Sequence, residues 1–435
     1  MKQVLNGLSS FLGNPLSWIT VIVFLVPVFL LIIKSWATTS LFLLFFICLW
    51  PISKHPKKYF LNRSHQFWAL LACLLIPFFS ELFAQMGRGE IVGSSLDGPA
   101  RMIMAATVFV YLSKFNCMRV IQFLSFGAAV GVVGVFLSLN FYPDSYWGDR
   151  AATYFVDPIT LPCFTVALLG LYLYLNTRVF PTHIDLLFKF ALIAMTVYIT
   201  IESQSRSAWV AFSCLLSAYL LYFLRRSVKS QLIGMVGLVV ALMALYFLSD
   251  IIYARTNEAV SGVLAFFYND ESLAATVQGT SSGQRLLLFL IDIHLILDSP
   301  FFGVADRAAL PPFDELQEGI PLLNKEIYEI KMLAGSHSEV LAQLARQGII
   351  FGFFTLCGLF FYPLYVFLWK LRYFAFRDGS LSPGVLGIIL PILTSSLTIQ
   401  VFNLKMTISF YGLCLAIFFA YLCQNVERES TEKAI

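Results

Sequence analysis

The chain has 435 residues, of which 59% are hydrophobic and only 12% are charged, and its formal net charge is +4. Soluble globular proteins carry about 25% charged residues. The composition therefore excludes a cytosolic enzyme, a nucleic-acid-binding protein and a secreted disulfide scaffold, and it predicts an all-α protein that crosses a membrane many times.

A membrane-spanning helix needs about 20 mostly apolar residues. By that standard the sequence contains about twelve candidate spans, at residues 17–34, 36–52, 66–85, 101–113, 120–139, 158–176, 186–201, 207–224, 231–249, 350–369, 384–400 and 406–423. Gly127 and Gly131, in the fifth of these, have the spacing of small residues that allows two helices to pack closely.

The distribution of lysine and arginine predicts the orientation of these spans. Basic residues fall in alternate connections: Lys54, Lys57, Lys58 and Arg63; Lys114 and Arg119; Arg178; Arg225, Arg226 and Lys229; Lys370, Arg372 and Arg377. The positive-inside rule makes this side cytoplasmic, and both termini then face the cytoplasm. The predicted parts are residues 1–249 with spans 1–9, an outward loop at 250–338, and residues 339–435 with the last three spans and a cytoplasmic C-terminus.

The loop at 250–338 carries signals of ordered helices. Ser281 to Gln284 and Ser336 to Glu339 both have the form of a capping box, in which a serine begins a helix and a Gln or Glu follows three residues later. The apolar residues after each box predict a helix. We therefore expect a helical cap over the outer face, with Arg285 in the first turn of one helix and His337 at the first position of another.

The predicted spans hold few ionisable residues, and those few, Glu81 among them, lie near span ends where long side chains can reach the interface. Chemistry is therefore expected at the outward face, where Arg206, Arg285 and His337 are the candidates. A first-turn arginine opposes the helix dipole, and a histidine there should stay neutral and able to accept a proton. Ordinary alternatives exist for each: an interfacial arginine, a salt bridge to a loop carboxylate and a surface histidine.

Two arginines and a neutral histidine suit a lipid linked to phosphate or pyrophosphate, because the planar guanidinium matches those oxygens. The eight cysteines and five histidines form no cluster with metal-ligand spacing. We therefore expect no metal and no cofactor.

At these residues the chain resembles the O-antigen ligase family and the related O-antigen polymerases. The resemblance covers most of the chain. It rests on S-R-S-A-W at 205–209, S-G-Q-R at 282–285, the large loop before the late spans, and His337-Ser338 followed after nine residues by Gly348. The family more often has asparagine where Ser338 stands.

The resemblance implies a reaction and a site. A glycan would move from undecaprenyl pyrophosphate to a sugar hydroxyl of lipid A–core, without a metal and with inversion, on the periplasmic face of a bacterial inner membrane. Arg206 and Arg285 would contact the pyrophosphate, and His337 would lie beside the anomeric carbon. Supporting positions are implied for Asp97, Arg101, Arg150 and Arg307.

Two other functions stay open at this stage. A polymerase would use the same donor with a second lipid-linked repeat unit as its acceptor, so the residues of the donor site cannot separate it from a ligase. A lipid-linked oligosaccharide flippase is disfavoured, because the spans have a charge-poor midplane and the candidate groups gather on one face.

Overall fold

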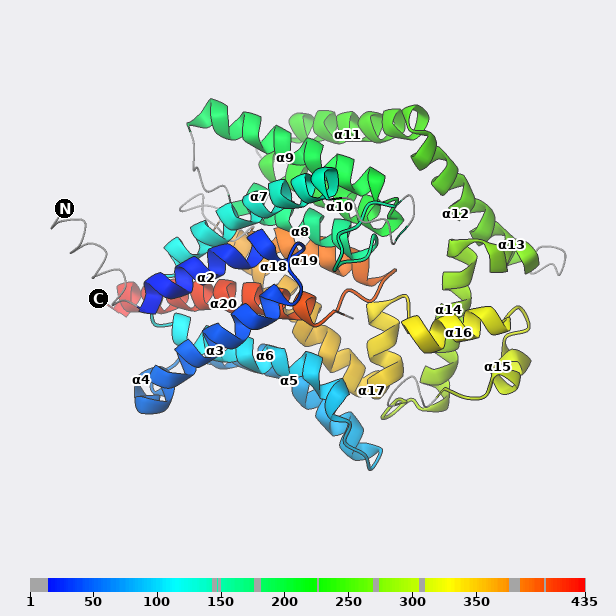
Figure 1. Cartoon of the computed structure of the whole chain (residues 1–435). Coiled ribbons are helices and arrows are strands. Elements are labelled where there is room, and N and C mark those ends of the chain that lie inside the picture. Colours follow the sequence, from blue (N-terminus) through cyan, green and yellow to red (C-terminus); the bar gives the residue numbers. More distant parts are fainter. Residues whose placement is uncertain are drawn as a thin grey trace.

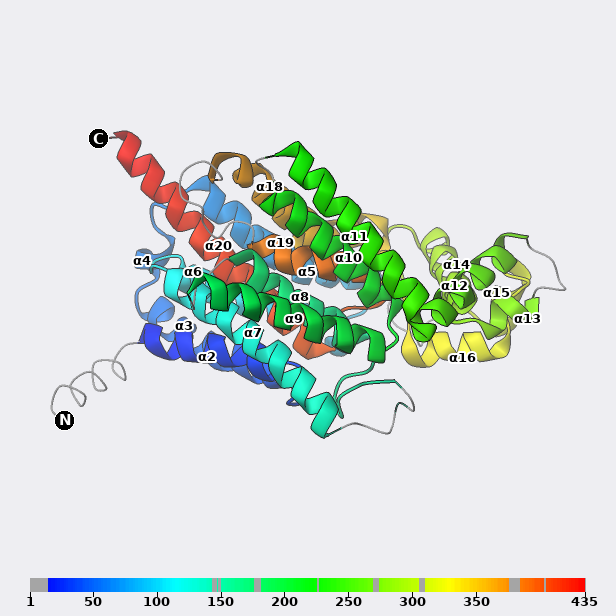
Figure 2. The same ribbon diagram turned by 90° about the horizontal axis from the view of Figure 1, so that it is seen from above.

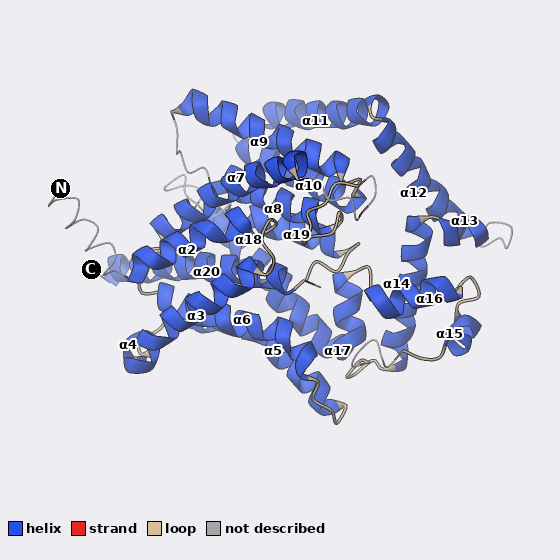
Figure 3. Ribbon diagram, in the orientation of Figure 1, coloured by secondary structure: helices blue, strands red, loops and turns tan. Residues whose placement is uncertain are grey.

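The computed structural model describes residues 15–142, 147, 150–175, 181–224, 227–268, 274–304, 310–374, 384–402 and 404–434. This described part of the chain is helical and contains no strand (Figure 3), apart from one isolated bridge between Thr153 and Val156. The predicted all-α class is confirmed for these residues.

Each predicted apolar stretch overlaps a helix over most of its length, although some stretches, such as 17–34 and 384–400, run past the helix end. The helices concerned are α2 (Pro15–Phe29), α3 (Trp36–Lys54), α5 (His65–Gly87), α6 (Gly93–Leu112), α7 (Met118–Phe141), α8 (Thr160–Leu175), α9 (Thr182–Glu202), α10 (Arg206–Phe223), α11 (Val228–Leu248), α17 (Glu339–Leu356) with η3 (Cys357–Phe361) and α18 (Tyr362–Phe374), α19 (Gly384–Ser396) and α20 (Lys405–Ala434). A short helix, α4 (Pro56–Phe60), follows α3. Among the described residues, eight helices are long and apolar enough to cross a membrane and three further apolar helices are shorter. Twelve spans therefore remain a prediction.

Close helix contacts in the bundle depend on glycine. A Cβ atom at Gly127 or Gly131 of α7 would lie 2.3 Å from a backbone oxygen of α2. Gly170 of α8 and Gly387 of α19 approach each other in the same way, since a Cβ at Gly170 would lie 2.0 Å from the Gly387 oxygen. The close packing predicted from Gly127 and Gly131 is thus confirmed.

The outer surface of the bundle is apolar, and α11 shows this most clearly. It lies at the edge of the bundle (Figure 1), and none of its residues is buried although its mean hydropathy is 2.3. A helix that is apolar on all sides needs an apolar solvent. The chain is therefore a multi-pass membrane protein.

A second group of helices lies together at one end of the bundle (Figures 1 and 2). It consists of α12 (Asp250–Tyr268), α13 (Ala274–Gly279), α14 (Ser281–Asp298), α15 (Phe313–Gly319) and α16 (Lys325–Ala334), and we call it the cap. The cap has its own small core, in which Leu287, Ile291 and Ile327 are fully buried. The N-terminal end of α2 and the C-terminal end of α20 lie at the opposite end of the bundle (Figure 1).

The two predicted capping boxes begin their helices at the wrong residue. Thr280, and not Ser281, caps α14: its hydroxyl accepts a hydrogen bond from the Gly283 amide at 3.3 Å. Ser338, and not Ser336, caps α17 through the Leu341 amide at 3.3 Å. Ser336 is used elsewhere, because its hydroxyl donates to the Asp292 carboxylate at 2.7 Å.

Candidate functional site

A cavity of about 140 Å³ lies where the cap meets the bundle. We call it the arginine cavity, because four arginines from separate segments line it: Arg150, Arg206, Arg255 and Arg285. His337 and Gln204 also line it. The structure thus brings together the three residues that the sequence singled out, although they are far apart in the chain.

The turn between α9 and α10 contacts Arg255 and Arg150, and Arg206 begins α10 directly after it. Gln204 has a left-handed backbone (φ 53°), and its side-chain oxygen accepts hydrogen bonds from Arg255 Nε at 3.1 Å and Nη2 at 2.7 Å. Arg206 donates to the Arg255 carbonyl at 3.2 Å, and Arg150 donates to the Ser203 carbonyl at 3.0 Å. Backbone oxygens therefore orient the guanidinium groups of Arg206 and Arg150, and neither group forms an ion pair within hydrogen-bond distance of a described carboxylate.

Arg255 differs from its neighbours because it has a carboxylate partner. Its Nη1 forms an ion pair with Glu258 Oε2 at 2.9 Å, one turn along α12. The other oxygen of Glu258 accepts a hydrogen bond from the Ser281 amide at the start of α14. Arg255 thus ties α12, α14 and the α9–α10 turn together beside the cavity.

The Arg285 guanidinium has neither a hydrogen bond nor an ion pair to any described residue. Burial and, to a smaller extent, the charges of Arg206 and Arg150 together lower the pKa of Arg285 to about 10. Because Thr280 caps α14, Arg285 lies in the second turn and not in the first, so neighbouring cations matter more here than the helix dipole. A cluster of four guanidinium groups with only one carboxylate partner among the described residues is a site for an anion.

His337 lies just before the Ser338 cap and not inside the helix as predicted. Its pKa is still lowered, to about 4, because the ring is buried and lies near the charges of Arg285 and Lys331. The imidazole is therefore neutral at pH 7, as expected, but for a different reason. Within the described residues no hydrogen bond holds the ring, so its nitrogen atoms are free to meet a substrate.

The segment that carries His337 is fixed on both sides. Ser336 contacts the carboxylate of Asp292 and accepts a hydrogen bond from Lys331 Nζ at 2.6 Å, and Lys331 also forms an ion pair with Asp292. After the histidine, the Glu339 amide donates to the Ile399 carbonyl at 3.1 Å. The histidine is thus held between the cap and the loop after α19.

Gly348, the glycine of the motif, kinks α17 with φ 76°. A Cβ atom there would lie 2.3 Å from the Phe301 carbonyl oxygen. The same approach brings the Ile349 amide to the Pro300 carbonyl (2.7 Å) and the Val304 amide to the Ala345 carbonyl (2.8 Å). The glycine therefore lets the segment that follows α14 dock against α17, the helix after His337.

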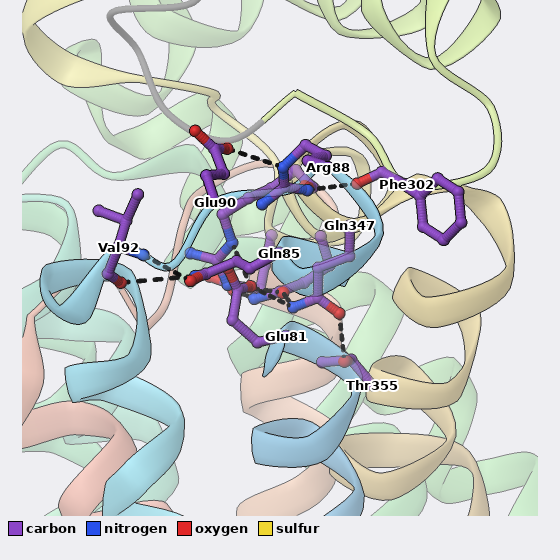
Figure 4. A network of polar contacts seen from close by, with 11 residues as sticks. Glu81, Gln85, Arg88, Glu90, Val92, Phe302, Gln347 and Thr355 are labelled. Carbon is purple, nitrogen blue, oxygen red and sulfur yellow. Dashed lines mark hydrogen bonds and ion pairs between the residues drawn. The ribbon is translucent and has the colours of Figure 1, made fainter. Parts of the chain in front are cut away.

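A buried polar network supports this docking from the other face of α17 (Figure 4). The Glu81 carboxylate accepts hydrogen bonds from Gln85 and Gln347, each at 2.8 Å, and forms an ion pair with Arg346 at 2.9 Å. Gln347 in turn accepts from Thr355 at 2.5 Å. Glu81 has no exposed surface, so the expectation that it reaches the membrane interface is wrong: its partners on α5 and α17 hold it inside the bundle.

Two further predicted residues, Asp97 and Arg101, are not at the arginine cavity. Arg101 donates to the Asp97 carboxylate at 2.6 Å, and Lys405 forms a second ion pair with that carboxylate. Neither Asp97 nor Arg101 lines the arginine cavity, so the structure does not gather them with Arg206, Arg285 and His337. Arg307 lies outside the described residues.

Sequence reasoning missed Arg255 and Gln204. The available signal was the spacing of Arg255 and Glu258, three residues apart and so able to pair on one helix face. Nothing in the sequence places that pair opposite the α9–α10 turn. Gln204 lies inside the quoted turn, but its role depends on its left-handed backbone.

A comparison with protein-family models supports the resemblance. Residues 190–357 match the model described as O-antigen ligase. This stretch contains Arg206, Arg255, Arg285 and His337, whereas Arg150 precedes it. The O-antigen ligase-type family expected from the motifs is therefore confirmed over these residues, and it consists of membrane enzymes of glycosyltransferase type. A search of curated proteins found no match.

Proposed function

We propose that this protein is an O-antigen ligase, which transfers a glycan from undecaprenyl pyrophosphate to a sugar hydroxyl of lipid A–core at the periplasmic face of a bacterial inner membrane. One observation carries the proposal: four guanidinium groups and a neutral histidine line one cavity, and four of these five residues lie within the family match.

The cavity supports the donor half of this reaction. Pyrophosphate is a leaving group that gains negative charge as the bond from the anomeric carbon to its oxygen breaks. Preorganised guanidinium groups stabilise such charge more in the transition state than in the ground state. In this proposal Arg206 and Arg285 contact the phosphate oxygens, and Arg150 and Arg255 complete the positive lining.

His337 would serve the acceptor half. The acceptor oxygen forms a bond to the anomeric carbon, the electron pair of the broken bond stays on the pyrophosphate oxygen, and the hydroxyl proton passes to an imidazole nitrogen. A base with a lowered pKa is a weak proton acceptor, but it is fully deprotonated at pH 7. A general base contributes about 10²–10⁴-fold, and alignment of the two substrates contributes more.

Reconstitution tests the proposal. The purified protein would be placed in lipid with undecaprenyl-pyrophosphate glycan and EDTA, with lipid A–core in one tube and extra donor alone in the other. A single shifted lipid A–core band supports a metal-independent ligase. A ladder from donor alone would replace it with the polymerase function, and the absence of any product in both tubes would refute glycosyl transfer.

A further inference from the structure

A second and larger cavity, of about 680 Å³, lies on the other side of the His337 segment. Its walls come from α5, α6, α17 and α20 of the bundle and from α14 and α16 of the cap. Ser336 and Glu339 line it, whereas His337, between them in the chain, lines the arginine cavity. The histidine segment therefore forms the partition between the two cavities.

The chemistry of the second cavity differs from that of the first. It mixes amide, hydroxyl and charged groups with apolar side chains, and its polar lining includes Ser95, Asp292, Gln343 and Gln400. Leu295, Leu359 and Phe402 supply apolar surface. A sugar ring offers the matching combination, because its edges carry hydroxyl groups and its faces carry C–H groups.

Asp292 is a buried and only partly satisfied carboxylate in this wall. The side chain is fully buried, and its Oδ1 is satisfied by Lys331 and Ser336. Its Oδ2 has no hydrogen-bond partner. A buried carboxylate oxygen without a donor costs free energy, so Lys331 and Ser336 are the groups that hold Asp292 at the cavity wall.

The reaction geometry indicates which sugar would occupy this cavity. If the pyrophosphate lies in the arginine cavity, then displacement with inversion requires the attacking hydroxyl to approach the anomeric carbon from the opposite side. The second cavity is on that side of His337. Resting on the proposed function, we propose that the second cavity binds the acceptor saccharide and presents its hydroxyl to the histidine segment.

Gly98 offers a test that leaves the packing intact. It lines the second cavity, and a Cβ atom there would have no neighbour within 4 Å. Gly98→Leu should therefore enter the cavity through a Cβ atom that meets no neighbour, and its longer side chain should take up cavity volume. Gly93, on the same helix, also has open space around its Cβ but does not line the cavity, so Gly93→Leu is the matched control.

The measurement is initial rate, with the acceptor glycolipid varied at saturating donor and then the reverse. Gly98→Leu should raise the acceptor KM about tenfold or more, as expected when one side chain occludes a substrate pocket, and should leave the donor KM unchanged. Gln400→Ala, which removes one polar group without filling the cavity, should raise the acceptor KM less. Gly93→Leu should match the parent protein.

The outcomes separate this inference from the function on which it rests. A parent protein that transfers no glycan refutes the proposed function. A parent that is active while Gly98→Leu retains the parental acceptor KM refutes the acceptor cavity alone. A rise in donor KM with unchanged acceptor KM would assign the cavity to the donor glycan and overturn the inference.

Discussion

Replacing Arg285 by methionine should stabilise the unliganded protein while abolishing transfer. The guanidinium is partly buried beside Arg206 and Arg150, and no described residue pairs with it. Methionine retains much of the length of the side chain and removes its charge. The substitution therefore removes the cost of burying the charge, together with the repulsion from Arg206 and Arg150, without leaving a partner unsatisfied.

The magnitude follows from the lowered pKa of Arg285. One pKa unit corresponds to about 1.4 kcal/mol, so a fall from 12.5 to about 10 limits the penalty to about 3 kcal/mol at pH 7, where the group is charged in both folded and unfolded states. Water in the cavity screens the repulsion, and about 1–2 kcal/mol is the expected gain. The substitution should be stabilising at every pH below about 10, because Arg285 is charged in the folded protein throughout that range.

The assay is thermal unfolding in detergent, beside the transfer assay. Arg285→Met should raise the unfolding midpoint by a few degrees and lower turnover by about 10²–10³-fold, the effect of losing one preorganised charge-stabilising group. Arg255→Met is the control, because it breaks the ion pair with Glu258 and the contacts with Gln204. It should lower the midpoint. Equal destabilisation by both substitutions would show that Arg285 has a structural partner and would refute the reasoning.

Three further predictions follow from the site. His337→Gln should lower turnover by about 10²–10⁴-fold. Because burial lowers the pKa of His337 to about 4, the parent should also lose stability as pH falls from 6.5 toward 4, and the variant should lose less. If the variant and the parent had identical pH–rate and pH–stability profiles, His337 would be neither the general base nor a buried neutral imidazole. Gly348→Ala should cost at least about 1–3 kcal/mol from its left-handed backbone and impair transfer. Gly237→Ala, with open space inside α11, should instead be neutral or stabilising by up to about 1 kcal/mol. Equal thermal midpoints would contradict this account. Arg101→Met should leave the donor KM unchanged, since Arg101 is absent from the arginine cavity, and a clear rise would return it to the donor site.

The helices could be predicted from the sequence because the signal is local. A run of apolar residues has only one low-energy backbone in lipid, where each amide must be satisfied within its own segment. The candidate site was partly accessible for a related reason: Arg206, Arg285 and His337 all lie at predicted helix boundaries on one predicted side. Their meeting in one cavity is a tertiary fact, and no spacing in the sequence predicts that Arg150 and Arg255 join them.

The errors have the same origin. Ser336 and Ser338 are equally good caps by residue type, and the choice depends on Asp292 and Lys331, which occupy the Ser336 hydroxyl. Glu81 lies near a span end by sequence, but its partners on α17 are more than 260 positions away. Long-range partners decide such cases, and a single sequence does not display them.

Both cavities take wall residues from the stretch that matches the family, but the second cavity also takes a larger share from other helices, and this bears on how acceptors are chosen. Four of the five charged or imidazole groups of the arginine cavity lie at 190–357, the stretch that matches the O-antigen ligase family. The second cavity takes much of its wall from α5, α6 and α20, outside that stretch. On the proposed assignments, a donor site common to ligases and polymerases is built largely from the matched domain, and the acceptor site adds to that domain the surfaces of α5, α6 and α20. Substitutions that change the acceptor without changing the donor should therefore be sought on α6 and α20, around Gly98 and Ile408, and not among the arginines.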